Sequence, residues 1–87
     1  MKYFFSELDE VTLTFGDIKK NSSGMEYINI YFEKPVDYGF NFLESSLPAL
    51  TVTDSKGFTD DEKSFLLNYA SRNAFLIWDI AREKAGV

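Results

Sequence analysis

The densest group of side chains able to do chemistry is an acidic run, Asp60-Asp61-Glu62. Paired carboxylates act as general acid and base when they face each other across a pocket that separates their pKa values. Consecutive helix residues instead point about 100° apart. These acids also follow Thr59, and the spacing of Thr59 and Glu62 is that of a capping box. The run therefore predicts the start of a helix and not a catalytic centre.

The chain lacks two of the residue types that catalysis and metal binding often use. It contains no histidine and no cysteine, so histidine-based triads, thiol nucleophiles and thiolate metal sites are excluded. A calcium loop starting at Asp54 would need an oxygen ligand at its third position and glycine at its sixth. Lys56 and Gly57 stand at the third and fourth positions instead. We therefore predict a non-enzymatic protein with no cofactor and no metal.

Charge and hydropathy limit the class of partner. The net charge is −5, from fourteen acidic and nine basic residues, and the basic residues are scattered along the chain. Because nucleic-acid-binding domains present a basic face, we expect no direct contact with nucleic acid. The first ten residues lack the apolar stretch of about 7–15 residues found in a secretory signal. No run approaches the roughly 18 apolar residues of a membrane span. We expect a soluble, cytoplasmic protein that does not bind membranes.

The first part of the chain has the pattern of β-strands. Apolar and polar residues alternate over 11–15 and again over 28–32, which is typical of strands with one buried face. Gly16 interrupts the first alternation, and this predicts a β-bulge. Phe40 and Phe42 suggest the apolar face of a third strand that closes at residues 43–44.

Two shorter strands and a helix complete the predicted fold. A strand at 50–53 follows from the same alternation, and residues 2–6 suggest an additional edge strand. Short polar connections favour pairing between consecutive strands. We therefore predict a single α+β domain spanning 1–87. It consists of a four- to five-stranded antiparallel meander sheet followed by one long C-terminal helix, from Thr59 to Gly86, packed across one face.

The predicted helix has more apolar surface than one sheet requires. Spacing at 3.6 residues per turn assigns seven residues to a sheet-facing arc: Leu66, Tyr69, Ala70, Leu76, Ile77, Ile80 and Ala81. Asn73 falls within this arc, and a buried amide needs a hydrogen-bond partner. A bond to the backbone or to a neighbouring tyrosine is the expected arrangement. The alternatives are a polar specificity contact at an interface and a contact to a ligand.

A second arc contains Leu67, Ala74 and Trp78, with Phe75 at its edge. A helix of about 37 Å would overhang a sheet about 24 Å wide, or cross it diagonally. We predict that this arc mediates homodimerisation, with Ser71 and Ala74 allowing close approach. Binding of a different protein is one alternative, and packing beneath the chain's own 2–5 or 44–50 segment is the other. The predicted interaction residues, called here the helix contact surface, are Leu67, Ser71, Ala74, Phe75 and Trp78.

The acidic composition supports an alternative function. An acidic inhibitor, of the immunity or anti-defence type, could block the basic site of a nuclease or another nucleic-acid-binding protein. Acidic groups would then imitate phosphates. The residues concerned are Asp9, Glu10, Asp37, Glu44, Asp60, Asp61 and Glu62. Salt distinguishes the two functions, because electrostatic association weakens as ionic strength rises and apolar association does not.

Overall fold

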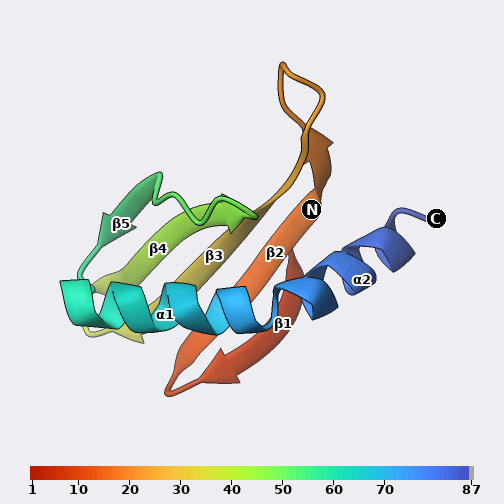
Figure 1. Ribbon diagram of the computed structural model, residues 1–87. Helices are drawn as coiled ribbons and strands as arrows, with labels where there is room; N and C mark the ends of the chain where they lie inside the picture. The colour runs from red at the N-terminus through yellow and green to blue at the C-terminus, as the bar shows by residue number, and fades with distance from the viewer. Residues whose placement is uncertain (87) are drawn as a thin grey trace.

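The computed structural model describes residues 1–86 and shows a five-stranded antiparallel sheet with two helices on one of its faces (Figure 1). Strands adjacent in the sheet are also consecutive in the chain, so the predicted meander and the predicted α+β class are confirmed. The elements are β1 (Tyr3–Leu8), β2 (Val11–Lys20), β3 (Glu26–Val36), β4 (Gly39–Leu47), β5 (Asp54–Lys56), α1 (Asp60–Arg72) and α2 (Ala74–Lys84).

The bulge predicted at Gly16 is present in β2. Phe15 pairs with Ile30, whereas Ile18 pairs with Ile28, so β2 contains one more residue than β3 between these pairs. The irregularity keeps both Phe15 and Ile18 in contact with the core, although they stand three positions apart. It also brings Asp17 to the N-terminal edge strand, where its carboxylate accepts a hydrogen bond of 2.7 Å from the Tyr3 hydroxyl.

Asp17→Asn is expected to lower the pKa of Tyr3. The carboxylate accepts the phenol's hydrogen bond, which raises the pKa of Tyr3 above its ordinary value and lowers that of Asp17. The stabilisation linked to Tyr3 is complete below its ordinary pKa of about 10 and is lost as pH rises through the raised pKa. The part linked to Asp17 is complete above about pH 4 and is lost as pH falls through the lowered pKa. An NMR titration of the tyrosine ring carbons measures the shift.

Asp37→Asn is the matched control for this titration. It removes the same charge from the turn between β3 and β4 and leaves the Tyr3–Asp17 hydrogen bond intact. Tyr3 should therefore titrate as in the unmodified protein. An unchanged Tyr3 pKa in Asp17→Asn would show that the hydrogen bond does not form in solution.

The strand assignment after residue 40 differs from the prediction. β4 continues to Leu47, past its predicted end at residues 43–44, and the next strand lies at 54–56 instead of 50–53. Its core-facing residues are Leu43, Ser45 and Leu47, so the predicted apolar face at Phe40 and Phe42 was wrong. The pairing with β3 explains the difference, because Leu43 lies opposite the buried Phe32.

Ser45 shows why a polar residue occupies this core-facing position. Its side chain is buried, and its hydroxyl donates a hydrogen bond of 2.9 Å to the Thr51 carbonyl. A buried hydroxyl with a partner costs little, whereas an unpaired one is destabilising. The bond also holds the segment after β4 against the sheet.

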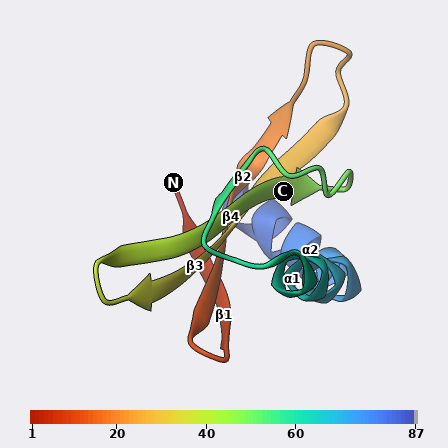
Figure 2. The same ribbon diagram turned by 90° about the vertical axis from the view of Figure 1, so that its left-hand side faces the viewer.

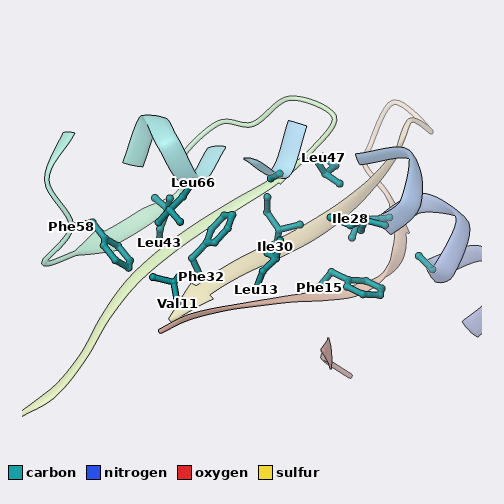
Figure 3. Packing of buried hydrophobic residues seen from close by; sticks show 13 residues of the cluster. Val11, Leu13, Phe15, Ile28, Ile30, Phe32, Leu43, Leu47, Phe58 and Leu66 are labelled. Atoms are coloured by element: carbon teal, nitrogen blue, oxygen red, sulfur yellow. The ribbon is translucent and has the colours of Figure 1, made fainter. Parts of the chain in front are cut away.

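The buried apolar side chains form one cluster between the sheet and the helices (Figure 3). Most come from β2, β3 and β4, and the helices contribute four more across the interface, Leu66, Ala70, Ile77 and Ala81. Phe58 closes one end of the cluster from the loop before α1, as Figure 3 shows. The cluster comprises Val11, Leu13, Phe15, Ile28, Ile30, Phe32, Leu43, Leu47, Phe58, Leu66, Ala70, Ile77 and Ala81.

The helix begins where the capping box predicted. The Thr59 hydroxyl accepts a hydrogen bond from the Glu62 amide at 3.1 Å, and the Glu62 carboxylate accepts one from the Thr59 amide at 2.8 Å. Asp60 forms an ion pair with Lys63 at 3.3 Å. The two hydrogen bonds of the capping box satisfy backbone amides that would otherwise lack partners at the N-terminus of the helix. Asp60 and Glu62 of the acidic run thus have structural roles.

The prediction of a single long helix was wrong, because the helical segment is divided at Asn73 into α1 and α2. The Asn73 amide nitrogen of the backbone contacts the carbonyls of both Tyr69 and Ala70, each at 3.2 Å. Its side-chain amide donates a second hydrogen bond, of 2.9 Å, to the Tyr69 carbonyl. Side chains that bond back to the preceding turn compete with the regular helical ladder and bend it. The expected backbone partner for Asn73 is therefore confirmed.

Candidate functional site

The predicted helix contact surface is divided between two environments. Leu67, Ala74 and Trp78 are partly buried and pack against the chain's own hydrophobic cluster. Ser71 and Phe75 are exposed. The five residues therefore do not form one uniformly exposed patch.

Trp78 is shielded on two sides. Its indole packs partly on the core, and the Arg82 guanidinium lies 5.3 Å from the ring centre. Arg82 also approaches the Glu26 carboxylate to 3.3 Å, which ties α2 to the start of β3. A cation above the face of an indole is attracted by the ring's negative face. Arg82 therefore covers part of the indole that the core does not.

Phe75 is the most exposed large apolar residue of the two helices, at 66%. It lies two positions before the fully buried Ile77, and a helix turns by about 200° over two residues. Its ring consequently points away from the sheet. Ser71 lies one turn earlier on the same side and presents only a small side chain. A projecting phenyl ring beside a small residue is a geometry that a facing helix can pack against.

Sequence reasoning missed a second exposed flank of the helices. Leu76 was assigned to the sheet-facing arc but is 41% exposed, and Phe65, which was not considered, is 55% exposed. The assignment of Leu76 was wrong because the side of the helices that faces the core is the one that carries Ala70, Ile77 and Ala81. Leu76 precedes Ile77 by one position, or about 100° of rotation, and so falls at the margin of the buried stripe.

The acidic residues of the alternative function occupy separate parts of the molecule. Asp9, Asp61 and Glu62 line one hollow, at the end where the β1–β2 turn meets the start of α1. Glu44 lies elsewhere, on the sheet face opposite the helices, in a second hollow of about 340 Å³. Figure 2 shows that the helices cover only one side of the sheet. The seven acids therefore do not form one continuous surface.

The uncovered sheet face has balanced charges and aromatic side chains. The Lys2 ammonium lies 4.0 Å above the centre of the Tyr31 ring and 3.8 Å from the Glu33 carboxylate. Phe42 and Lys56, which pair across β4 and β5, line the same hollow. Opposite charges and aromatic rings on neighbouring strands stabilise a sheet through cross-strand contacts. This face thus has a structural explanation for its side chains.

Among residues 1–86, no group of three or more histidine, cysteine or acidic side chains has an arrangement that could hold a metal ion. Neither α1 nor α2 has the length and continuous apolar character that crossing a lipid bilayer requires. The fold and surface define a small antiparallel α+β domain with exposed aromatic side chains on its helices. Comparisons with protein-family models, with curated proteins and with solved structures found no match to this chain.

Proposed function

We propose that this chain is a cytoplasmic, non-enzymatic protein-interaction domain that forms a homodimer through the helix contact surface. The main support for this proposal is the exposure of Phe75, which is 66% exposed on the side of α2 opposite the buried Ile77. Exposed aromatic side chains are enriched at protein interfaces, where they supply contact area at a low entropic cost. Leu67, Ala74 and Trp78 contribute the margins of the interface while their inner sides contact the core.

Isologous contact between two copies suits this surface. In a dimer with two-fold symmetry, Phe75 of each copy can pack beside Ser71 of the other, where the small side chain leaves room. The partly buried Trp78 then gains cover on its remaining accessible edge. A different protein carrying an apolar helix is the alternative partner, and it would use the same residues.

Phe75→Asp is expected to weaken dimerisation about 30-fold. Loss of an aromatic contact at the centre of an interface costs roughly 2 kcal/mol, and the introduced charges repel across the two-fold axis. Static light scattering over a range of concentrations measures the mass. Trp78→Ala is a poorer test, because Trp78 also packs on the core and its loss lowers the stability of the monomer.

Phe40→Asp is the matched control, since Phe40 is also well exposed, at 56%, but lies on β4, away from the helices. It should leave the dimer unaffected. The dimer should also persist at high salt, because apolar contacts are little affected by ionic screening. An unmodified protein that scatters as a monomer at tens of micromolar concentration contradicts the proposal, as does equal weakening by both substitutions.

A further inference from the structure

A hollow of about 280 Å³ opens at one end of the molecule, distinct from the helix contact surface. Its apolar lining reaches the edge of the hydrophobic core through Val11, Phe58 and Leu66. Figure 3 shows Phe58, Val11 and Leu66 together at that end of the cluster. Phe65 extends the lining outward and remains 55% exposed, so no segment of residues 1–86 covers this wall. The volume is enough for one large apolar side chain.

The rim of this hollow is acidic. Three carboxylates, those of Asp9, Asp61 and Glu62, line it together with one cation, Lys34. Three negative charges and one positive charge give the rim a net charge of −2. Glu62 is held in the capping box. The carboxylates of Asp9 and Asp61 form no ion pair and accept no side-chain hydrogen bond within residues 1–86, and so they can pair with a bound cation.

The apolar floor and the acidic rim of the hollow indicate which kind of ligand it binds. An apolar floor favours a buried aliphatic or aromatic group, and desolvating that floor drives binding. Acidic groups at the rim favour Lys or Arg beside that group and oppose acidic ligands. A second copy of this chain, with a net charge of −5, is a poor occupant because its charge opposes the rim. We infer that the hollow binds a basic segment of another protein, seating one Phe or Leu side chain between flanking Lys and Arg residues.

This inference does not rest on dimerisation. It limits the binding surface of the predicted acidic inhibitor to one end of the molecule, formed by the β1–β2 turn and the first turns of α1. The acids there pair with Lys and Arg of the bound segment, around its buried Phe or Leu side chain. That apolar side chain supplies affinity that persists at physiological salt, where ion pairs alone are weakened. Glu44, on the uncovered sheet face, takes no part in this contact.

A blocked peptide of sequence Lys-Arg-Phe-Arg-Lys serves as the probe. Titration into isotope-labelled protein should shift the backbone NMR signals of Asp9, Asp61 and Phe65 and leave those of α2 unchanged. Replacing the peptide's Phe by Ala should weaken binding about tenfold, as should Phe65→Ala in the protein. Asp9→Asn should weaken binding about threefold, and raising the salt concentration should weaken it further. Binding by the Ala peptide with unchanged affinity would overturn the role of the apolar lining.

Control variants separate this inference from folding defects and from dimerisation. Asn tolerates the positive φ of 50° at Asp9, so Asp9→Asn keeps the turn. Phe65 is exposed, so Phe65→Ala leaves the core intact. Asp79→Asn and Phe75→Ala change α2 only and should bind the peptide as the unmodified protein does. Equal loss in Asp79→Asn and Asp9→Asn, or no shift at millimolar peptide, overturns the inference whatever the oligomeric state.

Discussion

Phe32→Ala is expected to lower the free energy of unfolding by about 3–5 kcal/mol. Phe32 lies on β3, the central strand, and is 1% exposed. It pairs with Leu13 on one side and Leu43 on the other, so its ring is enclosed by neighbours from both strands. Truncation removes the buried ring from a close-packed site and leaves a cavity that the surrounding sheet cannot fill. Urea denaturation followed by circular dichroism measures the loss.

Phe40→Ala is the matched comparison on the adjacent strand. Phe40 is 56% exposed and faces away from the helices, so we expect a change within about 1 kcal/mol. A domain of this size has a total stability on the order of 5–10 kcal/mol, and Phe32→Ala removes much of it. Phe32→Leu, which keeps most of the volume, provides an intermediate point if Phe32→Ala unfolds. Similar losses from Phe32→Ala and Phe40→Ala would contradict the assignment of faces in β3 and β4.

Where a strand has one apolar and one polar face, the sequence was sufficient to predict it. Residues 11–15 and 28–32 alternate, and both segments are core strands in the structure. β4 has aromatic residues on its outer face and Ser45 on its buried face, so its own pattern is misleading. Its orientation is set by pairing with β3 and by the hydrogen bond from Ser45 to Thr51, both of which are tertiary contacts.

In the helices, too, some features could be predicted from the sequence, whereas others could not. Capping residues determined the start at Asp60, because their interactions are local. The division at Asn73 depends on a bond between its side chain and the preceding turn, and such bonds compete closely with regular helix. A helical wheel gives the angle between Leu76 and Ile77, but it does not give the direction of the sheet. The end hollow draws its residues from three separated parts of the chain, 8–11, Lys34 and 58–66, and no spacing in the sequence brings these parts together.

Gly57→Ala is expected to lower the free energy of unfolding by about 2–4 kcal/mol, from two causes. Gly57 connects β5 to α1 with a φ of 87°, a conformation that residues with a Cβ atom rarely adopt. The next residue, Phe58, is buried in the core, so the turn directs a core side chain as well as the helix cap at Thr59. The second cause is steric, because an added Cβ would overlap Oδ1 and Cγ of the Asn41 side chain, which would have to turn away.

Asn41→Ala separates the two causes. Alone, it should change stability by less than about 1 kcal/mol, because Asn41 is only partly buried and its amide forms no hydrogen bond within residues 1–86. Combined with Gly57→Ala, it removes the overlapping atoms and should restore about 1–2 kcal/mol, leaving the cost of the positive φ. Thermal denaturation of the four proteins gives the coupling energy. Strictly additive effects would mean that the backbone conformation alone excludes a side chain at residue 57, and that Asn41 moves aside without cost.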